Sequence, residues 1–321
     1  MPLKWIVHIC VLSLGLQSCG YIAEHTAPKK EPATTRTAAA LEADKLFWAT
    51  LHSGEYEQIQ PAVEAETAAY LGEPRDAVSA AHVAWLHIWR LSERARLAVT
   101  PASTTDDAFV ARRYFQEAVA LNPREARYLG FLASATLADG QINQDEAITR
   151  RGYYLLLDAI DAWPEFNLFT AGYVLSGQPA SSKNFKQALA WQWRNVDICI
   201  GEKINRDDPN LAPYMHLETR TGPKRACWNS WIAPHNFEGF FMSMGDMLVK
   251  AGDWQAARRI YANAKLSSTY SQWAFGAILD DRIRNAQQNV AAFNAPKSSA
   301  NPDSPRMMAD TAFSCVACHQ E

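Results

Sequence analysis

The chain has 321 residues, of which 48% are hydrophobic, and a formal net charge of −3. This length and composition are sufficient to bury a core in one or two domains, and the slight acidic excess argues against a nucleic-acid partner. No motif for serine, cysteine or metal hydrolases is present, and neither is a phosphate-binding loop or a dinucleotide fingerprint. The sequence therefore favours a folded protein without these common enzymatic signatures.

Residues 1–18 are predicted to form a secretory signal peptide. An apolar run from Trp5 to Leu16 follows Lys4 and is too short for a permanent transmembrane helix.

The next residues, Leu16-Gln17-Ser18-Cys19-Gly20, resemble the lipobox of bacterial lipoproteins. This resemblance implies cleavage before Cys19 and lipidation of Cys19, which would anchor the protein stably in a membrane. Glycine at position 20, rather than aspartate, would favour the outer membrane. The alternative is an ordinary signal peptide in which Cys19 is incidental.

Residues 19–40 are rich in Ala, Thr, Pro and Lys without periodicity, which predicts a flexible tether. From 41 to 293, apolar residues recur at three- and four-residue spacing between Gly, Pro and Asp/Asn turns, so we expect an all-α domain. The predicted helices are 41–53, 56–71, 75–98, 106–121, 125–138, 143–162, 164–176, 184–200, 235–251, 254–266 and 270–291. Residues 201–235 interrupt this helical spacing of apolar residues, and a loop of that length in a compact domain is commonly functional.

One stretch of the helical domain resembles the tetratricopeptide repeat. Gly245, Ala257, Tyr261 and Ala264 have the offsets of its small and aromatic packing positions. A second, partial match consists of Ala111, Phe115, Ala118 and Pro123. The resemblance implies an irregular tetratricopeptide-like array of helical hairpins, an α-solenoid. A plain irregular helix bundle is the alternative.

The last segment, residues 306–321, follows a Pro/Ser-rich linker at 294–305 and ends in Cys315-Val316-Ala317-Cys318-His319-Gln320-Glu321. This C-x-x-C-H string resembles the attachment motif of c-type cytochromes. The resemblance implies one covalent haem c, with thioether bonds to Cys315 and Cys318 and with His319 as the proximal iron ligand. The alternatives are a thioredoxin-like redox pair, for which no βαβ pattern is present, and a zinc site, for which a fourth ligand is missing.

The sixth iron ligand is open in the sequence. The candidates are Met307, Met308, Met215, His216 and His235. Met242, Met244 and Met247 lie in a predicted helix and are expected mainly in its core, and His82 and His87 are expected to be packing or surface residues. A methionine ligand would raise the reduction potential relative to bis-histidine ligation, whereas an empty position would admit small ligands.

The remaining cysteines predict a disulfide. Cys10 would leave with the signal peptide, Cys19 would carry lipid and the tail pair would carry haem, which leaves Cys199 and Cys227. Thiols in an oxidising compartment usually pair, so we expect a Cys199–Cys227 bond. Two separately buried free thiols are the alternative.

These patterns together favour a membrane-anchored, monohaem c-type cytochrome of the periplasm or cell surface, which transfers single electrons to a redox partner in the envelope. Its helical array would supply a docking surface. The alternative is a tetratricopeptide-like interaction scaffold whose haem is accessory or a sensor. An enzyme would need an open iron position with an acid–base residue beside it, and the sequence offers no support for one.

Overall fold

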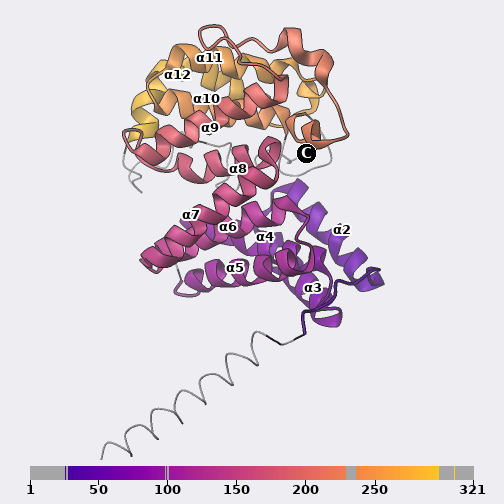
Figure 1. Ribbon diagram of the computed structural model, residues 1–321. Coiled ribbons are helices and arrows are strands. Elements are labelled where there is room, and N and C mark those ends of the chain that lie inside the picture. The colour runs from indigo at the N-terminus through magenta and orange to yellow at the C-terminus, as the bar shows by residue number, and fades with distance from the viewer. Residues whose placement is uncertain are drawn as a thin grey trace, which may run out of the picture.

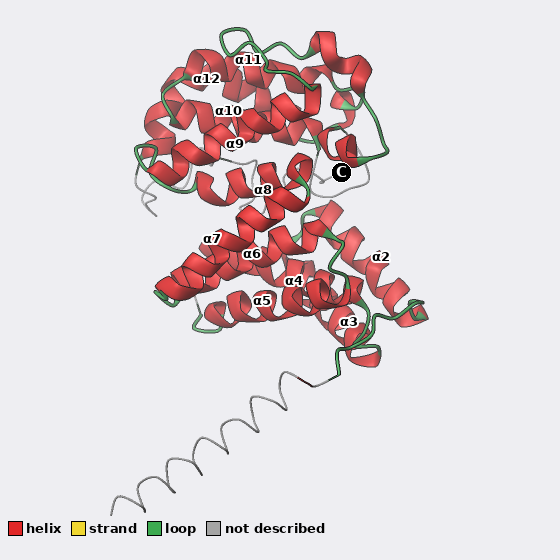
Figure 2. Cartoon of the chain, viewed as in Figure 1, coloured by secondary structure: helices red, strands yellow, loops and turns green. Residues whose placement is uncertain are grey.

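The computed structural model describes residues 28–97, 101–228 and 236–295, together with Thr26, Val99 and Met307. Every regular element in these described residues is a helix (Figure 1, Figure 2). The all-α fold class predicted from the sequence is therefore confirmed. None of the described helices is both long enough and apolar enough to cross a membrane.

Successive helices pair into hairpins, as expected for an irregular hairpin array. Helices α2 to α7 lie in the lower half of Figure 1 and α8 to α12 in the upper half. The pairs are α2 (Ala38–Ser53) with α3 (Ile59–Gly72), α4 (Ala77–Ser92) with α5 (Thr104–Leu121), α6 (Ala126–Ile142) with α7 (Glu146–Ala162), α8 (Pro164–Ser176) with α9 (Lys183–Ile200), and α10 (Phe237–Lys250) with α11 (Trp254–Asn263), while α12 (Gly276–Asn294) packs on α10 and α11.

Short polar side chains fix where the helices begin. Each accepts a hydrogen bond from a backbone N–H of the first turn, which would otherwise lack a partner. These N-cap residues include Thr37, Asp76, Asp145, Ser182, Asn236 and Asp253. At the other end, Gly54 and Gly201 close α2 and α9 in the left-handed conformation, which glycine adopts without a steric penalty.

Small residues let the paired helices approach closely. A Cβ added at Gly245 of α10 would overlap the ring of Tyr261 on α11, and Ala257 and Ala264 are fully buried. The predicted packing positions of the repeat-like stretch thus meet at one helix contact. Elsewhere, Cβ atoms at Gly140 and Gly152 would meet backbone nitrogens of the partner helix at 2.5 Å and 2.7 Å. No side chain fits at these contacts.

The partial repeat match also uses its predicted packing positions. Ala111, Phe115 and Ala118 of α5 are fully buried, and α5 pairs with α4. Their connection is long because α4 ends at Ser92 and a 3₁₀ turn, Glu93–Arg96, follows it.

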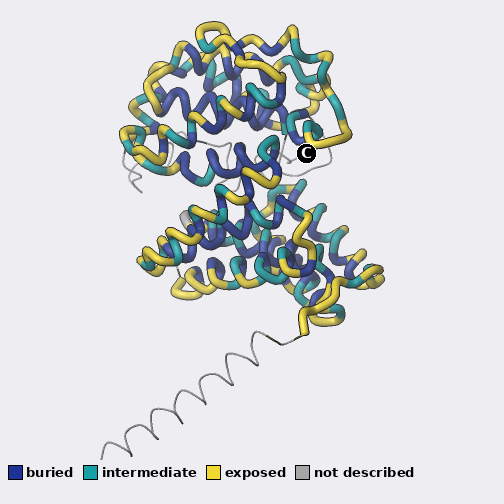
Figure 3. Tube along the Cα trace, viewed as in Figure 1, coloured by how far each residue is buried: buried dark blue, intermediate teal, exposed yellow. Residues whose placement is uncertain are grey.

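Three large apolar clusters run along the described part of the array, with a smaller one of Ala40, Ala43 and Ala69 between α2 and α3. Buried residues line the inner faces of the helices (Figure 3). The N-terminal core lies among α2 to α6 and includes Phe47, Trp89, Phe115 and Phe131. The middle core lies among α6 to α9 and includes Leu137, Leu156, Leu168 and Phe185. The C-terminal core lies among α8 to α12 and includes Phe240, Phe241, Tyr261 and Leu279. Each core is thus built by neighbouring hairpins, as in stacked repeats.

A buried polar group joins the last three helices. The Tyr261 hydroxyl donates to Asp246 Oδ1 at 2.5 Å, and Arg282 Nε of α12 lies 3.3 Å from the same oxygen. Burial raises the pKa of Asp246 to about 6, against the opposing effects of Arg282 and Tyr261. The group ties α10, α11 and α12 together at the contact where Gly245 meets Tyr261.

Helix boundaries differ from the sequence prediction mainly in two places. The helix predicted at 75–98 ends at Ser92 and gives way to the 3₁₀ turn. The helix predicted at 270–291 begins only at Gly276, because Tyr270–Gln272 forms a separate 3₁₀ turn, and it continues to Asn294. In both places the backbone changes between α-helix and 3₁₀ turn while the apolar pattern of the sequence continues, so the pattern does not reveal the boundary.

We predict that Gly245→Ala destabilises the protein by about 2 kcal/mol, because the added methyl group must displace the Tyr261 ring from a packed core. Chemical denaturation monitored by circular dichroism measures the change. The matched control is Gly177→Ala: this glycine is exposed, has φ −67° and nothing within 4 Å of an added Cβ. Because alanine fits there, the control should be neutral or slightly stabilising. Equal effects from both variants would contradict the close-contact interpretation.

Candidate functional site

Several predicted site residues lie outside the described part of the chain. They are the haem-attachment residues Cys315, Cys318 and His319, the lipidation residue Cys19, and the candidate ligands Met308 and His235. The others, Met215, His216, Cys199, Cys227 and Met307, lie in the half of the molecule built by α8 to α12 or pack on it. Three of these residues, Met215, His216 and Cys227, lie in the segment 201–228, which we call the excursion.

The excursion is an ordered part of the fold. It contains two 3₁₀ helices, η3 (Ala212–Leu217) and η4 (Pro223–Cys227). Ile204, Leu211 and Trp228 are almost fully buried members of the C-terminal core, and Ala226 belongs to the N-terminal core. The excursion thus contacts both halves of the array.

Side chains of the neighbouring helices satisfy the backbone of the excursion. The Leu211 amide donates to Asn263 Oδ1 at 2.9 Å, and Asn263 Nδ2 donates to the Pro209 carbonyl at 2.7 Å. The Ile204 amide donates to Asp197 Oδ1 at 3.0 Å. Buried backbone groups need such partners outside regular structure, so these bonds fix the path of the chain towards η3.

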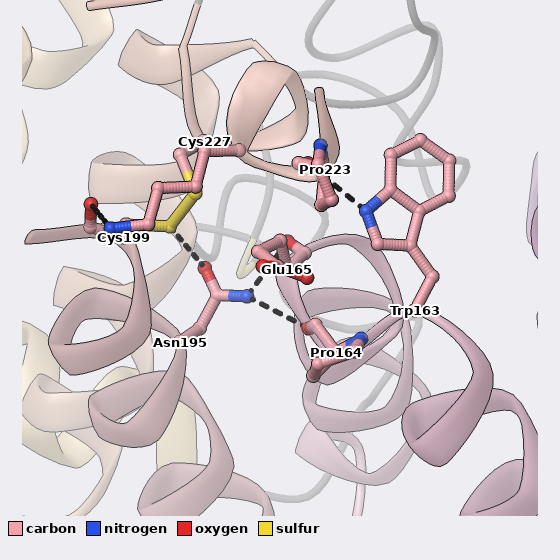
Figure 4. Close-up of a disulfide and its surroundings, with 8 residues drawn as sticks. Trp163, Pro164, Glu165, Asn195, Cys199, Pro223 and Cys227 are labelled. Atoms are coloured by element: carbon pink, nitrogen blue, oxygen red, sulfur yellow. Dashed lines mark hydrogen bonds between the residues drawn. A yellow bond between two sulfur atoms is a disulfide. The ribbon is translucent and has the colours of Figure 1, made fainter. Parts of the chain in front are cut away.

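A disulfide joins the end of α9 to the end of η4 (Figure 4). Cys199 and Cys227 have a Cα–Cα distance of 5.6 Å and a sequence separation of 28. Nearby, Lys224 Nζ donates to the Cys199 carbonyl at 3.2 Å and Trp163 Nε1 donates to the Pro223 carbonyl at 3.0 Å. The pairing expected from the cysteine inventory is present, and it closes the excursion into a loop.

A small pocket lies beside the disulfide. Its lining includes Cys199, Cys227, Trp228, Phe237 and Phe241. The space open to a water-sized sphere is only about 20 Å³, which is room for about one water molecule. A porphyrin does not fit there, so the pocket is a packing gap behind the disulfide and not a haem cleft.

The methionines of the body are used in packing. Met242, Met244 and Met247 on α10 are fully buried, which confirms the expectation that they belong to the core. Met215 of η3 is partly buried against the C-terminal core. Its side chain packs η3 against the body of the protein.

His216 is placed differently from its neighbour. Its side chain is exposed, and its Nδ1 lies 2.8 Å from the Pro213 carbonyl. A carbonyl oxygen only accepts hydrogen bonds, so Nδ1 carries a proton. In the neutral imidazole the lone pair is then on Nε2, the arrangement that metal-binding histidines commonly adopt.

Met307 packs on the body of the protein. It is partly buried against both the middle and the C-terminal cores. Cys315 follows eight residues later, and eight extended residues span at most about 29 Å. The start of the C-x-x-C-H motif therefore stays within that distance of the body.

A second polar cluster joins α2, α3 and α4. His82 Nδ1 of α4 lies 2.8 Å from Glu66 Oε1 of α3 and 3.0 Å from Asp44 Oδ1 of α2. The three ligand atoms lie within 4.8 Å of one another, a separation at which they could bind a metal ion. However, Arg36 makes a bidentate ion pair with Asp44 and also pairs with Asp76 at 2.8 Å. Because Arg36 already supplies the cation, we interpret the cluster as a structural ion network.

The network separates the pKa values of its members. Burial opposes the charge on Asp44, but hydrogen bonds from His82 and Arg36 outweigh it and lower the pKa of Asp44 to about 2. Burial raises the pKa of Glu66. Burial also opposes protonation of His82, yet Asp44 and Glu66 outweigh it, so the pKa of His82 is raised. The ring of His82 stacks on Phe47 at 3.9 Å, so the charge sits inside an apolar shell.

Sequence reasoning missed both this network and a second one on the same helix. His87 Nδ1 lies 2.8 Å from Asp107 Oδ1 of α5, and Arg90 donates to the same oxygen. Both histidines are buried in ion networks, and the expectation of packing or surface histidines overlooked their partners. These partners lie 16 and 20 residues away on other helices, so local periodicity carries no signal for them.

No protein-family model matches the sequence, and no curated protein or solved structure is similar enough to count as a match.

We predict that replacing both Cys199 and Cys227 by serine lowers the free energy of unfolding by about 3 kcal/mol, because the closed loop restricts the unfolded chain. Urea denaturation with and without a reductant measures this. The reductant should destabilise the native protein by a similar amount and leave the double variant unchanged. An equal effect of the reductant on both proteins would contradict a stabilising disulfide.

We predict that stability falls as the pH rises from about 6.5 through the folded-state pKa of His82. That pKa is raised, so the folded state holds the proton more tightly than the unfolded state and loses this advantage on deprotonation. One proton gives a slope of up to about 1.4 kcal/mol per pH unit. Thermal unfolding across this pH range measures it.

The test variant for this slope is Glu66→Gln, which removes one of the carboxylates that raise the pKa of His82. The folded-state pKa of His82 should therefore fall, and the pH range over which stability is lost should become narrower. The control is Glu64→Gln, an exposed position on the same helix that contacts Gln60. A wild-type slope that persists unchanged in Glu66→Gln would exclude the network as its source.

Proposed function

We propose that the protein is a lipid-anchored, monohaem c-type cytochrome of the periplasm or cell surface that transfers single electrons. The observation that carries the proposal is the string Cys315-Val316-Ala317-Cys318-His319. Its two cysteines would hold the porphyrin by thioether bonds, and His319 would bind the iron on the proximal side. Haem supplies a one-electron couple between ferric and ferrous iron.

The compartment features support this proposal. The apolar amino end with Cys19 is typical of an exported lipoprotein, and haem is attached to C-x-x-C-H outside the cytoplasm. The Cys199–Cys227 disulfide suits an oxidising compartment. The roles proposed for the cysteines are thus compatible with one location, the periplasm or the cell surface, with the outer membrane favoured by Gly20.

The arrangement of the tail also supports an electron carrier. A bare haem would expose a large apolar surface. Met307 packs on the body and is eight positions before Cys315, so the body would be within reach to cover part of the proposed haem. Docking of a redox partner would use the neighbouring helical hairpins.

A second candidate function is favoured by the fold. Arrays of helical hairpins present extended binding surfaces, and this chain builds such an array from α2 to α12. In this alternative the protein is an interaction scaffold whose haem is accessory or a sensor. Loss of Cys318 would then leave partner binding intact, whereas an electron carrier would lose its redox activity.

We predict that the full-length protein, expressed with cytochrome c maturation machinery, carries one haem per chain that survives acid–acetone extraction. Covalent thioether bonds explain this resistance. The pyridine haemochrome spectrum measures both the type and the amount of haem. Absence of covalent haem, in cells that mature a known cytochrome c, would overturn the proposal.

Two cysteine variants provide matched controls for haem attachment. Replacing Cys315 and Cys318 by alanine should abolish covalent haem. Replacing Cys199 and Cys227 by serine should leave it attached, since the disulfide lies on the body. Haem retained by the first variant, or lost specifically by the second, would contradict the assignment of the motif.

A further inference from the structure

The two halves of the array meet at Trp163. This residue directly follows α7, which ends at Ala162, and directly precedes α8, which begins at Pro164. Its ring stacks on Phe166 of α8 with a centroid distance of 5.3 Å, and both side chains belong to the N-terminal core. Trp163 therefore lies at the joint between helices α2 to α7 and helices α8 to α12 (Figure 1).

The short helix η4 covers this joint. Trp163 Nε1 donates to the Pro223 carbonyl at 3.0 Å (Figure 4). The guanidinium carbon of Arg225 lies 4.3 Å from the centroid of the Trp163 ring, a cation–π contact. Ala226 is buried in the N-terminal core. A segment from the C-terminal half thus packs on the residue at which the N-terminal half ends.

Few buried side chains hold the chain around η4. Among residues 218–227, which we call the covering segment, only Ala226 is buried. The residues on either side are firmly anchored, since Leu211 and Trp228 are almost fully buried. Segments with few buried apolar contacts open at low free energy while the rest of a protein stays folded. The covalent bond from Cys227 to Cys199 is therefore the main restraint on the covering segment.

The two sulfurs of this bond differ in their surroundings. Cys199 is 7% exposed, whereas Cys227 is partly exposed at the end of η4. An attacking thiolate would thus reach the sulfur of Cys227, and Cys199 would be the leaving group. Lys224 Nζ donates to the Cys199 carbonyl at 3.2 Å, and a cation beside a cysteine stabilises its thiolate.

We propose that the Cys199–Cys227 disulfide is a redox switch that controls whether the covering segment stays on Trp163. The reductant is a protein dithiol. Its first thiolate attacks the Cys227 sulfur and forms a mixed disulfide, while the Cys199 thiolate leaves and takes up a proton. Its second thiol then displaces Cys227, so two electrons and two protons pass to the protein and the reductant becomes a disulfide. The covering segment opens and uncovers Trp163, and this device does not depend on haem.

The first test asks whether the disulfide can be reduced in the folded protein. The full-length chain is treated with dithiothreitol without denaturant, and the thiols freed are labelled after a denaturing quench and located by mass spectrometry. Cys199 and Cys227 should both be labelled, and the far-ultraviolet circular dichroism recorded before the quench should remain that of the native protein. A disulfide that is reduced only after denaturant is added would overturn the inference.

Trypsin measures the opening of the covering segment, because proteolysis follows the population of the open form. After the reductant is removed under argon, cleavage after Lys224 and Arg225 should be about tenfold faster in the reduced protein than in the oxidised one. The variant in which both Cys199 and Cys227 are replaced by serine should be cleaved as fast as the reduced protein, with or without prior reduction.

Two residues of the same disulfide loop provide the internal control. Lys203 and Arg206 flank the almost fully buried Ile204, and Arg206 pairs with Asp197 of α9. Cleavage after these two residues should be equally slow in the oxidised and the reduced protein. Unchanged cleavage after Lys224 and Arg225 would overturn the inference. Equal acceleration after Lys203 and Arg206 would also overturn it, because reduction would then unfold the whole loop and not release one segment.

Discussion

The close approach of paired helices is the constraint on which the rest of the structure depends. At Gly245 the space of a side chain is taken by the Tyr261 ring, and at Gly140 and Gly152 by backbone of the partner helix. At such contacts no volume is left for a cofactor between the two helices, since interiors are filled to crystal-like density. The pocket beside the disulfide has room for about one water molecule. Neither these contacts nor this pocket could hold the proposed haem, which would instead be carried by the tail.

The excursion is where the array departs from simple stacking. A long segment without regular secondary structure must find hydrogen-bond partners for its backbone, and here Asn263 and Asp197 supply them. The Cys199–Cys227 disulfide adds a covalent anchor. The same anchors that satisfy the chain also hold η3 in one orientation. This anchoring lowers the conformational freedom of the chain around His216, so the exposed imidazole is held in one place.

Much of the fold could be predicted from the sequence, and the failures have physical causes. Apolar spacing located the helices, and the offsets of Gly245 and Tyr261 predicted an actual contact. Cysteine inventory predicted the disulfide. The start of α12 was misplaced because Tyr270–Gln272 keeps the apolar pattern while changing to a 3₁₀ turn. The networks around His82 and His87 were missed because their partners come from other helices. Among five candidate ligands, sequence alone could not distinguish packed Met215 from exposed His216.

Placing the attachment motif at the end of a linker has an energetic consequence. Contact between tail and body is an intramolecular equilibrium, so its strength depends on the linker as well as on the ligand. Met307 packs on the body and is eight positions before Cys315, and a short connection lowers the entropy cost of closing a loop. In the proposed cytochrome, Met307 would thus tether the haem-bearing segment to the helical hairpins, on which a redox partner would dock.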